Sequence, residues 1–180
     1  MNILTNSPGM SVLFLHLSDI HLKEGRNNIF AKIAGIQGVV TGQQMSFEAG
    51  FLVLSGDIAY SGKAEEYEKA TEFISTLRRS LSEVSEVKNW HIVTLPGNHD
   101  CDFEKDDETR RTLTESLLSN TKKNLDDAFL TNCLKPQKDF FKFAEKEIGH
   151  TYAKQSDYLA NSVSFPVGDR IIVFNLYNTA

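Results

Sequence analysis

Three short clusters of polar residues carry side chains of the types that bind metal ions. Each cluster directly follows a short apolar run. The clusters are Ser18-Asp19-Ile20-His21, Ser55-Gly56-Asp57 and Pro96-Gly97-Asn98-His99-Asp100. Together they offer carboxylate, imidazole and amide ligands, a mixed set that suits Mn, Fe, Ni or Zn better than Ca or Mg. We therefore expect one transition-metal site where the fold brings these clusters together.

The spacing within the clusters suggests how they would bind. Asp19 and His21 are two residues apart, so in an extended segment both side chains leave the same face and could chelate one ion. Asp57 adds a carboxylate that could bridge two ions, and Asn98 adds an amide oxygen. Taken singly, each of these Asp residues would more often be an ordinary turn residue. The metal site is favoured because the clusters occur together.

The elements around the clusters predict a parallel sheet. Apolar runs at 11–18, 49–54 and 90–95 predict buried strands, and the spacing of apolar residues at 28–40 and 64–81 predicts helices between them. Strand, helix, strand, helix, strand is typical of a parallel sheet with right-handed crossovers. Ligands bind beyond the carboxyl ends of such strands, so all three clusters should meet there.

The remainder of the chain differs in character. We expect residues 1–9 to form a tail and residues 10–180 to form one domain, with a polar helical insertion over about 101–160. Two apolar segments, 162–166 and 170–176, flank Val167-Gly168-Asp169 and predict a β-hairpin. The second segment is so apolar that we expect it to be buried on both faces.

Composition sets broad limits on function. The chain has 180 residues, a formal net charge of −5 and 24% charged residues. These are ordinary globular values, and the acidity argues against a general nucleic-acid coat protein. No run approaches the length of a membrane helix. The two cysteines form no C-x-x-C pair, which favours a reduced, cytoplasmic protein.

The three clusters also match a known family pattern, D-x-H, then G-D, then G-N-H-D. It stands here as Asp19-Ile20-His21, Gly56-Asp57 and Gly97-Asn98-His99-Asp100. In these motifs the chain resembles the calcineurin-like metallophosphoesterases over about residues 11–101. The resemblance implies an α/β fold, a β-sandwich flanked by helices with a βαβαβ start. It also implies metal-dependent hydrolysis of phosphate mono- or diesters.

The resemblance further implies a role for each motif residue. Two divalent ions, Mn, Fe, Zn or Ni with Mn favoured, would clamp the attacking and leaving oxygens. The first ion would be bound by Asp19 and His21, the second by Asn98, and both by Asp57. His99 would protonate the leaving oxygen or stabilise the phosphoryl group. Asp100 would orient and charge His99, as a carboxylate does for a catalytic imidazole.

The family pattern continues with a lone His and a G-H-x-H motif, which we do not find. Gly149-His150-Thr151-Tyr152 begins in the same way, but Tyr152 stands in place of the second His, and we reject it as a ligand. We therefore expect the chain to be the N-terminal portion of a longer parent that supplies the closing histidines. Cys101-Asp102-Phe103 is similar to larger bacterial members that carry extra domains.

Two alternatives are a non-catalytic binding module that keeps the fold, and a nuclease acting on DNA or RNA. The expected partners are a phosphate-ester substrate, with nucleotides and nucleic acids as candidates, and the missing part or extra domains of the parent. We expect no membrane partner, and self-association through an exposed apolar strand edge. The mild positive bias of residues 110–155 is interpreted as a solvated surface in preference to a phosphate-attracting cap.

Overall fold

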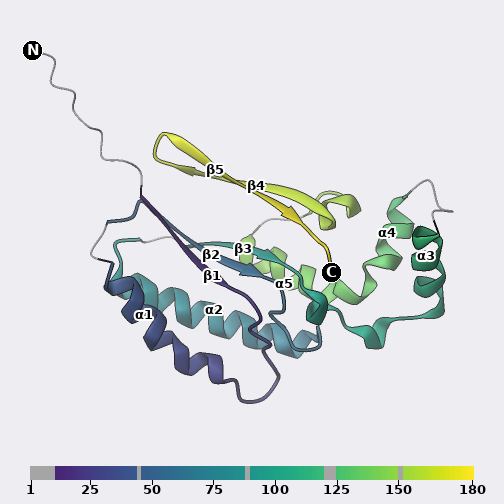
Figure 1. Cartoon of the computed structure of the whole chain (residues 1–180), viewed down its shortest axis with the longest axis horizontal. Helices are drawn as coiled ribbons and strands as arrows, with labels where there is room; N and C mark the ends of the chain where they lie inside the picture. Colours follow the sequence, from purple (N-terminus) through teal and green to yellow (C-terminus); the bar gives the residue numbers. More distant parts are fainter. Residues whose placement is uncertain (1–10, 44–45, 88–89, 120–124, 150–151) are drawn as a thin grey trace, which may run out of the picture.

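The computed structural model describes residues 11–43, 46–87, 90–119, 125–149 and 152–180. Three layers are visible in Figure 1: a helical layer, a parallel sheet and a β-hairpin. The tail expected at residues 1–9 lies outside the described residues. Within the described ranges, no helix combines the length and the apolarity that crossing a membrane requires.

The parallel sheet predicted from the three apolar runs is present. Its strands are β1 (Val12–Leu17), β2 (Ala49–Ser55) and β3 (Trp90–Leu95), in the order β1-β2-β3. Both pairings are parallel, with Leu15 opposite Leu52 and Leu52 opposite Ile92. All three carboxyl ends therefore lie at one edge of the sheet, which is the arrangement that the three clusters require.

The helices cover one face of this sheet. They are α1 (Ile33–Thr41), α2 (Ala64–Val84) and α5 (Lys138–Ile148), and a 3-10 turn at Asn28–Lys32 precedes α1. Leu52 and Leu54 of β2 belong to the core of this layer, together with the apolar face of α2 and four residues of α5. The core residues of the two helices are Tyr67, Ala70, Phe73, Ile74, Leu77, Leu81, Phe140, Phe141, Phe143 and Ala144.

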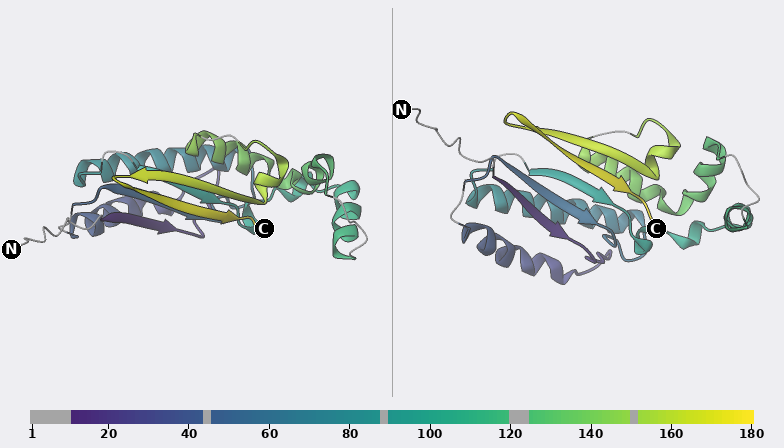
Figure 2. Two further views of the ribbon diagram at one scale, coloured as in Figure 1. Left: turned by 90° about the horizontal axis from the view of Figure 1, so that it is seen from above. Right: turned by 45° about the horizontal axis from the view of Figure 1, so that its top comes forward.

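The polar insertion predicted over about 101–160 contains further helices. These are α3 (Glu108–Leu118) and α4 (Asp127–Cys133), which lie at one end of the molecule in both views of Figure 2. The last helix of this region, α5, ends at Gly149, whose φ of 70° is the left-handed helix end that glycine allows. The insertion is thus only partly peripheral, because α5 belongs to the core.

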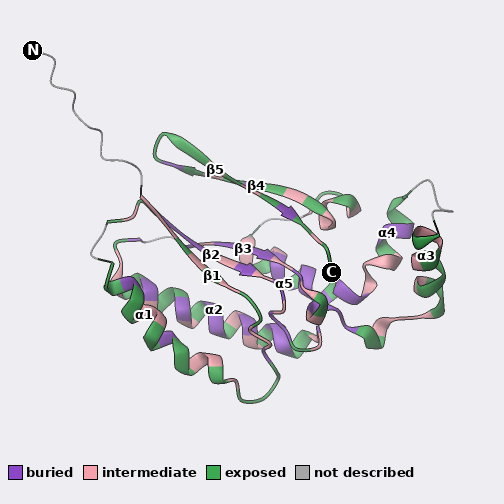
Figure 3. Ribbon diagram, in the orientation of Figure 1, coloured by how far each residue is buried: buried purple, intermediate pink, exposed green. Residues whose placement is uncertain are grey.

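The predicted hairpin is formed by β4 (Ala160–Val167) and β5 (Arg170–Tyr177), which pair antiparallel. One face packs on the sheet, where Val163, Val167 and Leu176 meet Phe51 and Val93. The expectation that the segment 170–176 is buried on both faces was wrong. Its other face is exposed, as Figure 3 shows, with Ile171 at 70% and Val173 at 54%.

A buried carboxylate ties the loops at the sheet edge to α2. Asp100 is 0% exposed. It accepts hydrogen bonds from the backbone N–H of Gly97 at 2.8 Å, of Ala59 at 2.9 Å and of Ile58 at 3.2 Å. The hydroxyl of Tyr67 in α2 donates a fourth at 3.0 Å. Burial raises the pKa of the Asp100 carboxyl, and these four donors oppose that shift by stabilising the carboxylate.

We predict that Asp100→Ala lowers the free energy of unfolding by about 3–5 kcal/mol, because four buried donors lose their acceptor. Denaturant unfolding of the metal-free protein measures this loss. Asp169→Ala is the control: the Asp169 side chain is 93% exposed, so its removal should change stability by less than about 0.5 kcal/mol. Equal unfolding midpoints for the two variants would contradict the proposed importance of the buried carboxylate.

Candidate metal centre

The three loops that follow β1, β2 and β3 bring three titratable side chains together. His21, Asp57 and His99 each offer one ligand atom, and these atoms all lie within 4.8 Å of one another. The imidazole rings of His21 and His99 are 4.6 Å apart at their centroids and nearly perpendicular. Residues that are separated by up to 78 positions in the sequence thus converge on one small site.

Backbone hydrogen bonds hold the first two loops against each other. The N–H of His21 donates to the carbonyl of Asp57 at 2.9 Å, and the N–H of Leu22 donates to that of Ile58 at 2.8 Å. Leu22 and Ala59 form a parallel bridge that continues the pairing of β1 and β2 beyond the strand ends. Ladder bonds on both sides therefore fix where His21 and Asp57 stand.

The backbone at these positions is unusual. Among the described non-glycine residues, positive φ occurs at Asp19 (54°), His21 (50°) and Asp57 (52°), all of them motif residues. This left-handed conformation costs an L-residue on the order of 1 kcal/mol, and such strain clusters at functional sites. It also corrects the expectation of an extended Asp19–His21 segment, since left-handed residues do not alternate as strand residues do. Asp19 is exposed and lies outside the close group of three.

The third loop positions Asp57. The N–H of His99 donates to Oδ1 of Asp57 at 3.0 Å. Gly97 packs so closely that a Cβ atom there would stand 2.2 Å from the same oxygen and 2.5 Å from the Asp57 nitrogen. A side chain at position 97 would therefore displace the carboxylate, so glycine is required here by space alone.

His99 is oriented by a backbone carbonyl. Its Nδ1 lies 2.8 Å from the carbonyl oxygen of Tyr60, and because a carbonyl only accepts, Nδ1 must donate. This leaves Nε2 for chemistry at the centre. The family resemblance implied that Asp100 would orient His99. This expectation was wrong, because the Asp100 carboxylate is directed to Gly97, Ile58, Ala59 and Tyr67.

Two residues that shape the candidate site were not expected from the sequence. Tyr60 supplies the carbonyl that binds His99, and its ring lies 5.8 Å from the His99 ring. Tyr67 anchors the Asp100 carboxylate from α2. Tyr60 could have been considered because of its place in the sequence, three residues after Asp57 and therefore close to the predicted site. None was available for Tyr67, whose apolar helix spacing predicts an ordinary core residue.

The donor set fits a bound metal ion. Nδ1 of His21 is buried and has no hydrogen-bond partner among the described residues. Buried polar atoms are nearly always satisfied, so an orphaned imidazole nitrogen beside a carboxylate calls for a further partner. Imidazole and carboxylate are ligands that first-row transition metals share.

Asn98 is exposed on the same loop as His99, and His150 lies outside the described residues.

One cavity adjoins this centre. It has a volume of about 320 Å³ and includes Asn98 and His99 in its wall. Its other lining residues are Tyr60, Ser61, Lys63, Cys101, Asp102, Phe103 and Glu104. Cys101 is buried, and its burial raises the pKa of the thiol, which makes it a poor nucleophile.

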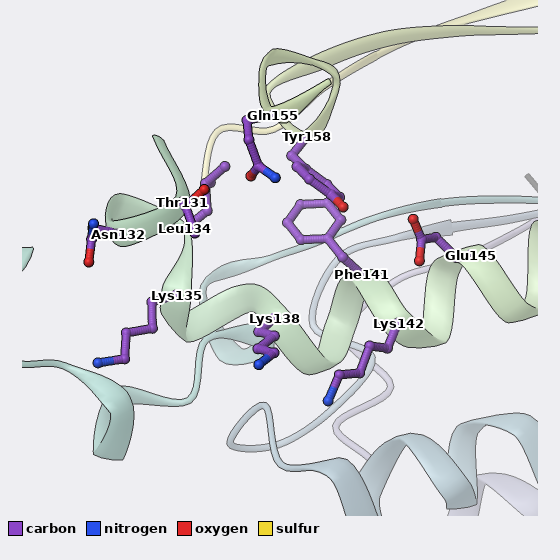
Figure 4. A pocket seen from close by; sticks show the side chains of 10 residues that line it. All are labelled: Thr131, Asn132, Leu134, Lys135, Lys138, Phe141, Lys142, Glu145, Gln155 and Tyr158. Atoms are coloured by element: carbon purple, nitrogen blue, oxygen red, sulfur yellow. The ribbon is translucent and has the colours of Figure 1, made fainter. Parts of the chain in front are cut away.

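A second cavity, of about 470 Å³, lies away from the centre between α4, α5 and the segment before β4 (Figure 4). Phe141 and Tyr158 form its apolar wall, and their ring centroids are 4.3 Å apart. Lysine side chains of α5 and of the turn before it lie at the rim of this cavity. Two of them are already in ion pairs, Lys135 with Asp107 and Lys142 with Asp139. None of the three residues of the close group lines this cavity.

Of the comparisons with known proteins, the one with family models gave a match. A search of curated proteins and a search of solved structures each returned no significant match. A family model described as calcineurin-like phosphoesterase matches residues 12–172, which include all three motifs and nearly every described element. The chain therefore belongs to the calcineurin-like phosphoesterase family.

Proposed function

We propose that this chain hydrolyses phosphate mono- or diesters at the centre formed by His21, Asp57 and His99. Its family consists of metal-dependent phosphoester hydrolases, which sets the reaction class. The observation that carries the proposal is the convergence of His21, Asp57 and His99, whose ligand atoms lie within 4.8 Å of one another, together with an Nδ1 of His21 that has no partner among the described residues. An imidazole nitrogen without a protein partner remains available to a bound ion.

The proposed ligands are Asp19, His21, Asp57 and Asn98, which would hold two divalent ions, with Mn²⁺ favoured over Fe, Zn and Ni. When bound, such ions withdraw charge from phosphoryl oxygens and make water more acidic. Support for His21 and Asp57 comes from their place in the close group. Asp19 and Asn98 are supported by the family motifs and by their positions on the same loops.

His99 is proposed as the general acid. Because Nδ1 donates to the Tyr60 carbonyl, the transferable proton of the imidazolium stands on Nε2, which can pass it to the leaving oxygen. Asp100 acts through the backbone: it holds the loops that carry Asp57 and His99 in place.

The nuclease and the binding module are weaker proposals. A nuclease needs a basic groove, yet Lys135 and Lys142 of the insertion are neutralised by Asp107 and Asp139. A binding module would take up metal without turnover, which the activity assay below distinguishes. A cytoplasmic location stays a proposal, supported by the two free cysteines.

The first prediction concerns metal affinity. Asp57→Asn should weaken Mn²⁺ binding by about 100-fold or more and abolish phosphatase activity, because the variant loses an anionic ligand. Titration calorimetry with MnCl₂ measures the affinity. Asp169→Asn removes an exposed carboxylate of the hairpin turn and should bind Mn²⁺ like the unaltered protein. Unchanged affinity in Asp57→Asn would exclude this carboxylate as a ligand.

A second prediction uses the tight contact of Gly97. Gly97→Ala should weaken Mn²⁺ binding by about 10- to 100-fold although it removes no ligand, because the new methyl group displaces the Asp57 carboxylate. Gly35→Ala is the matched control: nothing lies within 4 Å of its new Cβ, and alanine favours the helix. Wild-type affinity in both variants would show that Asp57 is free to bind from another position.

A third prediction separates proton donation from binding. His99→Ala should slow hydrolysis of phenyl phosphate by about 10²- to 10⁴-fold, since phenolate is a poor leaving group without a proton. The loss should be much smaller for 4-nitrophenyl phosphate, whose leaving group needs no proton. Steady-state kinetics at saturating Mn²⁺ measure both. Equal losses for the two esters would argue for phosphoryl stabilisation in place of general-acid catalysis.

A further inference from the structure

The cavity beside the metal centre has a wall of unusual composition. Two large aromatic side chains line it, Tyr60 at 47% exposure and Phe103 at 60%. A phenylalanine that is exposed to this extent contributes little hydrophobic stabilisation to the fold. No ring contact to Phe103 occurs among the described residues, so its face is open to a ligand. We name this cavity the Tyr60–Phe103 pocket.

We propose that the Tyr60–Phe103 pocket receives the leaving group of the substrate and selects leaving groups that carry a flat aromatic ring. The proposal rests on the phosphoesterase function proposed above and narrows its substrate class. The esters it selects are those of ring-bearing alcohols, with nucleosides among them.

The Tyr60–Phe103 pocket lies where the leaving group of a bound substrate would be. His99 forms part of the pocket wall and also belongs to the close group at the metal centre. A general acid must reach the leaving oxygen within hydrogen-bond distance. Whatever is attached to that oxygen must then lie beside His99, and the Tyr60–Phe103 pocket is the space there. Its volume of about 320 Å³ is at the lower end of the range of small-molecule sites.

The charges of the pocket wall favour an uncharged leaving group. The ionic groups of the pocket wall are already paired with protein groups. Lys63 binds Glu104 at 2.6 Å, and Asp102 binds Lys105 at 3.0 Å. The hydroxyl of Ser61 donates to Glu66 at 2.9 Å. A charged leaving group would have to compete with these partners, whereas an uncharged ring needs only an aromatic face, which the exposed Phe103 offers.

The Tyr60 ring is held in place by contacts on the protein. The ammonium of Lys23 lies 3.9 Å from the centroid of the Tyr60 ring, a cation–π contact that holds the ring. The backbone carbonyl of the same residue binds His99. The ring and the catalytic imidazole are therefore fixed to one another. A planar group that stacks in the pocket is placed in register with the proton donor, which favours proton transfer.

The test compares two esters of primary alcohols of similar acidity, benzyl phosphate and cyclohexylmethyl phosphate. They match in size, but only the first has a flat aromatic ring. With the Mn²⁺-loaded protein, kcat/KM should be about 5- to 100-fold higher for benzyl phosphate, the range expected for one aromatic stacking contact. In Phe103→Leu, which keeps apolar bulk without a ring, the ratio should fall toward one. Tyr177→Ala, which removes an exposed aromatic residue of the hairpin, should keep the original ratio.

A binding measurement keeps the two proposals separate. Saturation-transfer NMR with benzyl phosphate and the metal-free protein should show stronger transfer to the ring protons than to the methylene protons. This difference should be lost in Phe103→Leu. If neither ester is hydrolysed at full metal occupancy, the proposed function fails, and the NMR result alone decides the pocket. If both esters are hydrolysed at equal rates, or if ring saturation survives in Phe103→Leu, the pocket proposal is overturned and the phosphoesterase function stands.

Discussion

The arrangement of the metal centre depends on one buried carboxylate. Asp100 has no contact with solvent, and its oxygens accept three backbone N–H groups from the loops after β2 and β3. The hydroxyl of Tyr67 adds α2 to the same network. A charge in such a place is tolerated only when it is fully hydrogen-bonded, so the loops have one arrangement that satisfies it. The positions of Asp57 and His99 follow from that arrangement.

The hydrogen bonds of the buried Asp100 carboxylate explain how the strained backbone and the close packing around the centre are maintained. Left-handed φ at Asp19, His21 and Asp57 costs free energy in isolation, but the loops are held by bonds on several sides. The packing of Gly97 against Asp57 leaves the carboxylate little freedom to move. The candidate site is thus ordered by the protein's own bonds, and Nδ1 of His21 has no partner within it among the described residues.

Sequence patterns predicted the scaffold better than the contacts within it. The strand expected at 90–95 has those bounds, and the helix expected at 64–81 extends to Val84, because apolar spacing is a local signal of burial. The segment 28–40 begins as a 3-10 turn and continues as α1. The motifs located the loops, but three of the four partners of Asp100 lie 33 to 42 residues away, and the carbonyl that orients His99 lies 39 residues away. No local pattern encodes such bonds. The roles of Asp19, His21, Asp57 and Asn98 as ligands stay predictions.

The way the hairpin is attached has a mechanical consequence. Among the described residues, β4 and β5 pair only with each other, and they meet the three-stranded sheet through side chains such as Val163, Leu176 and Phe51. Dispersion contacts have no preferred direction, whereas backbone hydrogen bonds do. The position of the hairpin on the sheet is therefore set by the fit of side chains along its length and by directed bonds only just past β5, where Asn178 donates to Gln137 at 2.6 Å. The loops around Asp57 are joined to one another by directed bonds, so hydrogen-bond geometry fixes the edge that carries the candidate site, whereas shape complementarity fixes the opposite layer.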